Sequence, residues 1–597
     1  LTAVKEIEQI YEYVSALDIE FAILEDGTVV IFQVRPLAAA LKIIAPMTDR
    51  EFKDTKALAK CKYLDTFHIL SDMAFWNPAE IIGSNPRPLD YSLYRELITA
   101  HIWSAGLQPL GYQPVRGELM QKVGNKPYIS VNYTFDGLTP AGLPEDLCYK
   151  LNQYYEQKLR QDKTAHDKIE FEIIFNTYDF MTDTRLKELA EYGFDDVEIS
   201  QLRNALFEIA KQTLEHYDEI CEEDLRSLGQ LTELRHELRK HSPLAETNVM
   251  KLYSYIDELL DSIKDHGTPQ FTRQARCAFM ARSFCRTLVE KGYFTKQEMD
   301  DFMLSIPTVA SEFERDFDLY SHGKLSRDDF NHLYGHLRLG TYDIRSDSYR
   351  NIYFDVASAN LTGNNKVKQE AKSLDLERLQ VALDEAGIPV TPEKFIEFIK
   401  KATQNREYFK FEFTKSLSLM LDVIVKLGEV MAIAREDMSY LEIQDLLSYH
   451  SRDYYIQTIE TRRRFYHVNS YLVLPEVIFD VGDIDVIDID EARPNFITNK
   501  VVEAPIVNLD EDHDSDITGK IVVLTKADPG YDWIFAKDIA GFVTKYGGAA
   551  SHMAIRCAEF GIPAAIGCGE KIYQRIHRMQ IMCLDCENGR ITEKQSQ

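Results

Sequence analysis

"KYGGAASHMAIRCAEFGIP", residues 545–563, is the stretch that decides the fold of the C-terminal part of the chain. A short apolar strand ("GFVTK", from residue 541) leads through a glycine-rich turn to a helix expected to begin at about Ser551. Consecutive backbone N–H groups in such a turn, together with the positive N-terminal end of a helix, form a site for an anion. The stretch therefore predicts a strand–turn–helix unit with an anion-binding turn.

The histidine of this unit, His552, is expected in the first turn of the helix, beside whatever anion the turn holds. Imidazole can attack phosphorus to give a phosphohistidine. The N–H groups around Gly547 and Gly548 and a hydroxyl from Ser551 or Thr544 would stabilise the charge of that intermediate. The residues alone leave a second interpretation open, in which the glycines only make the turn, Ser551 caps the helix and His552 lies on the surface.

The overall composition is that of an ordinary globular protein, with 45% hydrophobic and 27% charged residues. The net charge of −28 argues against nucleic acid as the main partner, because phosphate backbones need a basic surface, but it allows a small phosphorylated ligand in a local positive pocket. No apolar run approaches the roughly 20 residues of a membrane span, so no membrane partner is expected. Nine cysteines without a repeated framework suit a reducing, cytoplasmic compartment.

Composition divides the chain, which at 597 residues is too long for one core, into zones that predict a multidomain α+β protein. Residues 1–40 are expected to form a helix and a hairpin that cannot bury a core of their own. Residues 41–484 predict a mainly helical domain, in which one helix carries an apolar stripe from Phe413 to Met431. Residues 485–504 are acidic and predict a linker with some strand character.

The last zone, residues 505–597, alternates short apolar runs with short helices and predicts a compact α/β domain of about 90 residues. The runs "KIVVLT", "AGFVTK", "PAAIG" and "QIMCLDC" are expected to be its strands, and residues 551–560 its helix. The pair Cys583 and Cys586 lacks a second ligand pair at a suitable spacing, so a zinc site is not expected there.

The N-terminal hairpin is predicted by the alternating segments "DIEFAIL" and "VVIFQVRP" around the turn "EDGT". Alternation along a strand puts Asp18 and Glu20 on one face, and Gln33 and Arg35 on one face of the partner strand. Carboxylate and amide oxygens suit a hard cation, and arginine suits phosphate. Either strand taken alone is equally compatible with the polar face of a surface hairpin.

The stretch "TKYGGAASHMAIRCAEFGIPAAIG" closely resembles the swivelling phosphohistidine domain of the PEP-utilising enzymes, which include pyruvate phosphate dikinase, PEP synthase and rifampicin phosphotransferase. The resemblance covers about residues 505–595 and includes "DPGYDWIF" and "DCENGRI". It implies that His552 carries a phosphoryl group between two sites. The family often has an arginine six residues after this histidine; here that position is Ala558, and Arg556 is expected to compensate the charge instead.

The hairpin "LDIEFAILEDGTVVIFQVRP" resembles the closing hairpin of the ATP-grasp nucleotide-binding domain in the same enzymes. The resemblance implies ATP and Mg²⁺ as cofactors, with Glu20 and Gln33 as ligands of Mg²⁺, Arg35 on the phosphates and Asp18 supporting the site. The remaining roughly two hundred residues of an ATP-grasp domain are not seen, so a truncated form that cannot turn over ATP alone is expected.

The acceptor is expected to bind in the central helical domain. A PEP-binding (β/α)₈ barrel needs about 200–250 residues, whereas 45 follow His552, so pyruvate is not the expected acceptor unless another chain supplies a barrel. The domain order resembles rifampicin phosphotransferase and, still more, the glutamine kinases of capsular phosphoramidate biosynthesis. In "LYGHLRLGTYDIRSDSYR" (333–350), the resemblance implies that His336, Arg338 and Asp343 bind a zwitterionic acceptor, although a buried polar network explains them equally well.

The sequence therefore predicts a phosphotransferase that converts ATP, an acceptor and water into AMP, phosphate and a phosphorylated acceptor through His552. The amide of L-glutamine is the first expected acceptor, and a rifamycin-like antibiotic is the second. A PEP synthase-like enzyme with its barrel on another chain, and a non-catalytic phosphocarrier, are the remaining alternatives. The sequence does not predict the oligomeric state.

Overall fold

The computed structural model describes most of the chain, which divides into two compact units. The first unit comprises Leu1–Ser470 and Glu476–Val481, and the second comprises Tyr471–Pro475 and Gly482–Gln597. The described residues are 17–23, 29–36, 49–64, 68–338, 342–351, 373–470, 472, 474–484, 494–498, 500–509, 516–526, 531, 534–535, 537–546, 552–576, 579, 581–587 and 590–593.

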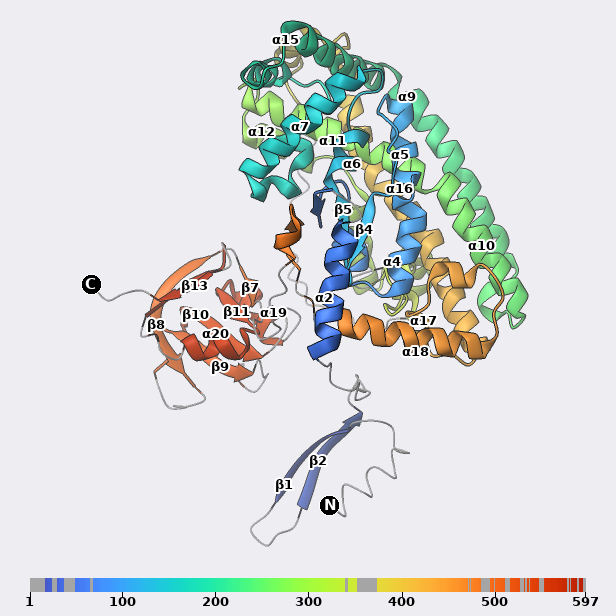
Figure 1. Ribbon diagram of the computed structural model, residues 1–597, viewed down its shortest axis with the longest axis vertical. Coiled ribbons are helices and arrows are strands. Elements are labelled where there is room, and N and C mark those ends of the chain that lie inside the picture. The colour runs from blue at the N-terminus through green and yellow to red at the C-terminus, as the bar shows by residue number, and fades with distance from the viewer. Residues whose placement is uncertain are drawn as a thin grey trace. The chain divides into compact units, whose positions relative to one another are not determined.

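The N-terminal hairpin is present as predicted. Strand β1 (Leu17–Ile23) pairs antiparallel with β2 (Val29–Pro36), and the register shifts between Glu20 and Phe21 (Figure 1). Asp18 is opposite Arg35 and Glu20 is opposite Gln33. Directly opposed residues share a face of an antiparallel pair, and residues two apart in one strand do as well. The four positions singled out from the sequence therefore lie on one face of this two-stranded ribbon.

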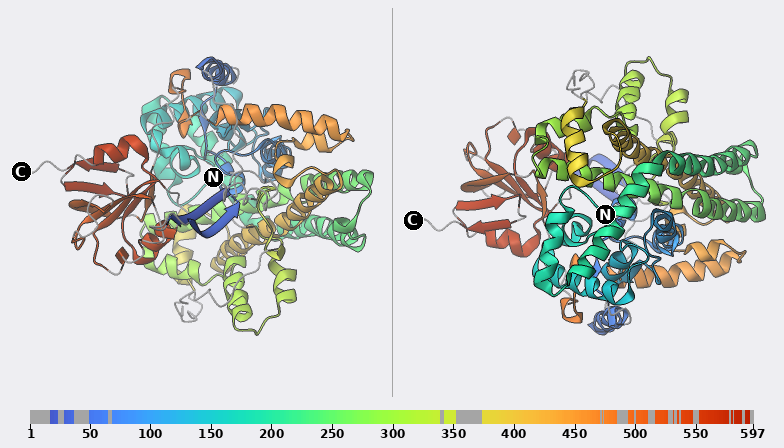
Figure 2. Two further views of the ribbon diagram at one scale, coloured as in Figure 1. Left: turned by 90° about the horizontal axis from the view of Figure 1, so that it is seen from below. Right: turned by 90° about the horizontal axis from the view of Figure 1, so that it is seen from above.

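The body of the first unit is helical, as predicted, and its longest helices pack side by side around one core (Figures 1 and 2). Its α-helices are α2 (Asp49–Leu64), α3 (Pro78–Ile82), α4 (Pro88–Tyr94), α5 (Ile102–Leu107), α6 (Val131–Gly137), α7 (Glu145–Gln161), α8 (Thr182–Arg185), α9 (Asp196–Lys240), α10 (Val249–His266), α11 (Thr268–Glu290), α12 (Lys296–Leu304), α13 (Val309–Ser321), α14 (Arg327–Tyr334), α15 (Leu376–Ala386), α16 (Pro392–Val430), α17 (Arg435–Met438) and α18 (Arg452–Asn469). Shorter 3₁₀ and π turns lie between them: η1 (Arg95–Thr99), η2 (Gln108–Leu110), η3 (Lys163–Asp167), η4 (Ile169–Ile173), η5 (Leu186–Tyr192), η6 (Pro243–Ala245), η7 (Tyr349–Asn351) and η8 (Ile443–Leu446). A further 3₁₀ turn, η9 (Val481–Asp483), spans the boundary between the two units.

Two of these helices, α9 and α16, form the framework of the site described below. Asp195 caps α9 by accepting from the backbone N–H groups of Val197 and Glu198, and the Glu198 side chain completes the capping box. Thr391 caps α16, and Pro392 occupies its first position, where a missing N–H costs nothing. The apolar stripe predicted along α16 is core: Phe413, Leu417, Met420, Leu421, Ile424 and Leu427 are all buried.

A small antiparallel sheet is also part of this unit, in the order β4 (Met120–Val123), β5 (Lys126–Ser130), β3 (Leu70–Ser71) and β6 (Val477–Ile478). The sequence did not predict these short strands. Residues 471–475 already belong to the second unit, but residues 476–481 return to the first because β6 pairs with β3 there.

The second unit is built on a seven-stranded sheet in the order β13–β12–β8–β9–β10–β11–β7. The central strands β8, β9, β10 and β11 run parallel, and β7, β12 and β13 pair antiparallel toward the edges. The strands are β7 (Asn495–Ile497), β8 (Val501–Asn508), β9 (Ile521–Lys526), β10 (Gly541–Tyr546), β11 (Ala564–Ile566), β12 (Ile581–Asp585) and β13 (Arg590–Glu593); the helices are α19 (His552–Phe560) and α20 (Gly569–Ile576) (Figure 1).

Both faces of this sheet are covered. Val522 and Leu524 of β9 pack in one apolar cluster with Met553 and Cys557 of α19, and the alternate residue Val523 packs in another with Tyr573 and Ile576 of α20. A parallel strand buried on both faces is apolar at every position, which is why "KIVVLT" is a continuous apolar run.

The predicted strands at 521–526, 541–546, 564–566 and 581–585 and the predicted helix are thus confirmed. The strand character predicted for the linker over 485–504 is present in its second half, where residues 495–497 form β7 and residues 501–504 begin β8; both strands belong to the sheet of the second unit. Among the described residues, no helix is both long enough and apolar enough to cross a bilayer.

Candidate functional site

The turn between β10 and α19 is the position at which the sheet presents His552. β10 lies between the parallel strands β9 and β11, and α19 makes the crossover from β10 to β11. His552 is the first residue of α19, where the backbone N–H groups have no partners within the helix. In open parallel sheets, the carboxyl ends of the strands are where ligands bind. The side chain of His552 and residues Gly547, Gly548 and Ser551 lie outside the described part of the chain, so their roles stay predictions.

Thr544 lies near the carboxyl end of β10 and is fully buried. Its hydroxyl oxygen accepts from the backbone N–H of Gly567 at 3.2 Å. Its carbonyl accepts from the N–H groups of Gly567 at 3.1 Å and of Cys568 at 2.8 Å. Thr544 therefore joins the end of β10 to the segment after β11 through these hydrogen bonds. Its expected contact with a phosphoryl group remains a prediction.

Arg556 follows His552 by one helical turn, so the two positions lie on the same side of α19. Its half-buried guanidinium lies over the ring of Phe560, with the carbon 4.6 Å from the centroid, and 5.9 Å from that of Phe535. The two rings are stacked, with centroids 5.6 Å apart. This aromatic pair holds a positive charge on the His552 side of the helix by a cation–π interaction.

The N-terminal hairpin, expected to belong to an ATP-grasp domain, is described only in its backbone. Its register brings Asp18, Glu20, Gln33 and Arg35 to one face, and this set of oxygen donors beside an arginine suits Mg²⁺ on a nucleotide phosphate. Their side chains lie outside the described part of the chain, so the ligand set for Mg²⁺ and ATP stays a prediction. Among the described side chains, no cluster of three or more His, Cys, Asp or Glu residues could hold a metal ion.

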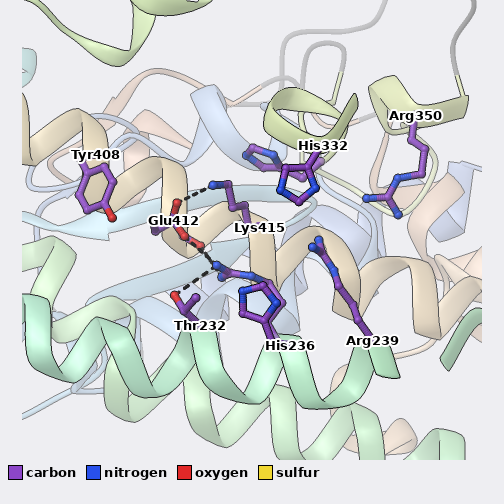
Figure 3. Close-up of a pocket in the computed structure, with 10 residues that line it drawn as sticks. Thr232, His236, Arg239, His332, Arg350, Tyr408, Glu412 and Lys415 are labelled. Carbon is purple, nitrogen blue, oxygen red and sulfur yellow. Dashed lines mark hydrogen bonds and ion pairs between the residues drawn. The ribbon is translucent and has the colours of Figure 1, made fainter. Parts of the chain in front are cut away.

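The helical unit contains a cavity of about 200 Å³ between α9, α14 and α16. The α9 residues recur at spacings of three and four, which puts them on one face of the helix, and the α16 residues do the same. Figure 3 shows side chains from both helices and from the segment after α14 converging on this space. The cavity is lined by Thr232, Arg235, His236 and Arg239 of α9, by His332 of α14, by His336, by Arg350 of η7, and by Tyr408, Glu412 and Lys415 of α16.

Positive charge dominates this cavity, although the chain as a whole carries −28. One carboxylate, Glu412, lies among four permanent cations. Arg235 donates to it at 2.7 Å, and Lys415 forms a second ion pair with it (Figure 3). Arg239 and Arg350 have no ion-pair or side-chain hydrogen-bond partner among the residues that the structure describes. Counting Glu412 against the four cations leaves a net charge of +3 around the cavity.

His336 lies deep in this cavity, with 5% of its surface exposed. Its ring meets Phe411 edge to face at 4.6 Å, and within the described structure its Nε2 has no hydrogen-bond partner. Burial lowers the pKa of His336 to about 3, and the neighbouring cations, first Lys415 and then Arg235, add to this effect. The imidazole is therefore neutral at physiological pH, and its unsatisfied Nε2 is buried beside the cations of the cavity.

Of the three residues expected to bind the acceptor, His336 lines the cavity whereas Arg338 and Asp343 do not, and their joint role stays a prediction. The fully buried Arg338 donates to the Asp422 carboxylate at 2.6 Å and to the Ser418 carbonyl at 3.1 Å. Asp343 accepts from the backbone N–H groups of Arg345 and Ser346 at 2.7 and 3.1 Å. Both form the buried polar network that was the alternative interpretation of this motif, because the chain after α14 is not helical and turns these side chains elsewhere.

A second buried group near this network was not singled out from the sequence. Asp90, in the first turn of α4, is fully buried, and its Oδ2 has no partner among the described residues. Burial raises the pKa of Asp90 to about 8, with the Asp343 carboxylate adding to the rise. The carboxyl group is therefore largely protonated at neutral pH.

Sequence reasoning also missed most of the cavity residues: Arg235, His236, Arg239, His332, Arg350 and Lys415. One available signal was the segment "LRHELRK", whose cations recur at helical spacing within an acidic chain. A basic helical face is more often solvated than functional, so the spacing alone does not indicate a site. Only the packing of α16 and α14 against this face encloses the cations in a cavity.

Comparisons with known proteins bear on these observations. Residues 517–589 match the family described as "PEP-utilising enzyme, mobile domain". The chain is 28% identical over 222 residues to rifampicin phosphotransferase of Bacillus subtilis (strain 168), covering 34% of this chain and 24% of the relative. It is 27% identical over 212 residues to the rifampicin phosphotransferase of Bacillus cereus (strain ATCC 14579), covering 32% and 24%. The matched segments span about a quarter of these curated relatives.

The second unit is thus a PEP-utilising enzyme mobile domain, as the "GGAASH" motif predicted. This match and the similarity to two rifampicin phosphotransferases relate this part of the chain to the PEP-utilising, phosphohistidine swivelling-domain enzymes. Its expected relationship to glutamine kinases within that family stays a prediction.

Proposed function

We propose that the protein is a phosphotransferase in which His552 accepts a phosphoryl group derived from ATP and passes it to a small polar acceptor. The observation that carries this proposal is the family match of residues 517–589, which contains His552 at the first position of α19. Unsatisfied N–H groups at a helix start favour the dianionic phosphoryl group, and Arg556 contributes a positive charge one turn away. ATP and Mg²⁺ as cofactors, held through the hairpin, are part of the same proposal.

The size and polarity of the helical cavity support a small acceptor. At about 200 Å³ it is below the roughly 300–1,000 Å³ of pockets that hold drug-sized ligands, and its lining is mostly charged. We place the L-glutamine amide first among the acceptors because the order of the domains resembles that of the glutamine kinases, and we do not assign its binding to this cavity. A rifamycin is the second candidate, favoured by the matches to two rifampicin phosphotransferases, and it requires a larger apolar site than this cavity offers.

The test is to incubate the full-length protein with ATP, Mg²⁺ and either L-glutamine or rifampicin, and to follow AMP and phosphorylated acceptor by ³¹P NMR. AMP formed with glutamine, and lost in His552→Ala but retained in a control at the exposed His322→Ala, supports the first acceptor. AMP formed with rifampicin alone supports the second. AMP formed with neither acceptor contradicts the enzymatic proposal and favours a phosphocarrier.

A further inference from the structure

We propose that the cavity between α9, α14 and α16 is a binding site for a small dianion, a phosphate group either free or carried on a small molecule. The proposal rests on the cavity itself and holds whether or not His552 is phosphorylated. Its basis is a cluster of cations that the protein does not neutralise, arranged around an unsatisfied buried nitrogen.

The first argument is the imbalance of charge. The cavity has a net charge of +3, and its two uncompensated cations, Arg239 and Arg350, come from segments more than a hundred residues apart in the sequence. Like charges held in proximity destabilise the fold unless a counter-charge relieves them. Burial lowers the pKa of Arg239, the charges of Arg350 and Arg235 lower it further, and the Glu412 carboxylate opposes this effect only in part. A bound dianion would remove most of this repulsion.

The second argument is the layering of the cavity. Its floor consists of the buried Arg235, His336 and Glu412, whereas His236, His332 and Arg350 are exposed at its rim. Hydrogen bonds hold the floor residues in place before any ligand binds, since Arg235 donates to the Glu412 carboxylate at 2.7 Å and to the Ser416 hydroxyl at 3.0 Å. An anion would therefore enter from solvent past the rim and meet a preorganised wall of donors, so little reorganisation is required for binding.

The third argument concerns His336. A buried polar atom without a hydrogen-bond partner is costly, so such atoms are rare in folded proteins. A neutral imidazole in the tautomer that protonates Nε2 would donate to a phosphate oxygen, and the guanidinium groups would supply charge-assisted bonds to the other oxygens. A bound anion would thus satisfy the one polar atom of the floor that has no hydrogen bond in the described structure.

The charge also decides against a simple zwitterion as the preferred occupant. Glutamine offers one carboxylate together with an ammonium group, whereas the cavity provides four cations and one carboxylate that is already paired. A phosphate dianion neutralises two of the three excess charges, and bidentate contacts with arginine suit its oxygens. The preferred ligand therefore carries a phosphate group.

The experiment measures the binding of inorganic phosphate and of glycerol 3-phosphate to the full chain by isothermal titration calorimetry, with glutamine as the comparison ligand. Arg239→Gln and Arg350→Gln remove the two unpaired cations without breaking any ion pair of the described structure, so both variants are expected to fold. Each lost charge-assisted contact is worth roughly 1.5–3 kcal/mol, so the affinity for phosphate should fall roughly ten- to hundredfold in each variant.

The matched control is Arg226→Gln, which removes an exposed charge from the same helix about 20 Å away and should leave the affinity within about twofold. Tighter binding of glycerol 3-phosphate than of phosphate identifies an organic phosphate as the ligand, and the reverse order identifies phosphate itself. Absence of binding to both, tighter binding of glutamine, or equal affinity in the Arg239→Gln and parent proteins would overturn the proposal.

Discussion

Glu412→Gln is the substitution whose cost follows most directly from the structure of the cavity. The Glu412 side chain is 10% exposed and the Arg235 side chain 4%, so this ion pair is screened very little by water. Removing one partner of a buried pair leaves an uncompensated charge, at a cost of about 3–5 kcal/mol. The change also removes the counter-charge of Lys415 and raises the net charge of the cavity from +3 to +4.

The free energy of unfolding of the helical unit, measured by urea denaturation followed through helical circular dichroism, should therefore fall by about 3–5 kcal/mol in Glu412→Gln. The matched control is Glu429→Gln on the same helix. Glu429 is 61% exposed and pairs with Lys426, so its loss should cost at most about 1 kcal/mol.

Phosphate should restore part of the lost stability, because an anion that binds only the folded protein at a hundred times its Kd stabilises it by about 2.7 kcal/mol. The variant should gain at least as much from phosphate as the parent, since its cavity holds one more uncompensated charge. Equal costs for Glu412→Gln and Glu429→Gln would refute the reasoning that this pair is a buried neutralising element.

Three further substitutions test other parts of the structure. Gly106→Ala should lower the free energy of unfolding by about 1–3 kcal/mol, because a Cβ there would lie 2.6 Å from a backbone oxygen of α11. The control Gly229→Ala, whose Cβ would meet nothing within 4 Å, should raise the free energy of unfolding slightly. Equal effects of the two substitutions would contradict the close packing of α5 on α11. Asp90→Asn should stabilise the protein more at pH 8 than at pH 5, because folding raises the pKa of this carboxyl from its usual 3.8 to about 8. Between these pH values the folded parent protein binds a proton that the unfolded chain lacks, so the stability of the parent falls as the pH rises. A difference in the free energy of unfolding that does not change with pH, measured by urea denaturation, would exclude this. Thr544→Val should destabilise the second unit by about 0.5–1.5 kcal/mol in thermal unfolding, because the Gly567 N–H loses its hydroxyl acceptor. The variant should still allow labelling of His552 with phosphate. Complete loss of labelling in a folded variant would show that the Thr544 hydroxyl takes part in phosphoryl transfer.

Much of the second unit could be predicted from the sequence because its parallel strands are buried on both faces and read as continuous apolar runs. β8 was missed for a physical reason: Val501, Glu503 and Pro505 alternate with less exposed residues, and a proline inside a strand removes one N–H from the ladder. β7 is three residues long and follows an acidic segment, so no local pattern marks it.

The helical cavity could not be predicted because its charges come from three separate segments. Arg235 and Arg239 have the spacing of an ordinary solvated helix face, and only the packing of α16 against α9 turns that face inward. The same limit applies to the motif at 333–350. The structure places His336 at the cavity and directs Arg338 to Asp422, and the spacing of the motif could not indicate this difference.

The most direct test of the account is to treat the full-length protein with ATP and Mg²⁺ without acceptor, and to locate the acid-labile, base-stable phosphate by peptide mass spectrometry. The account predicts a single phosphorylated histidine at His552, released on addition of the acceptor and absent from His552→Ala. Stable phosphate on another residue, or labelling that persists in His552→Ala, would contradict it.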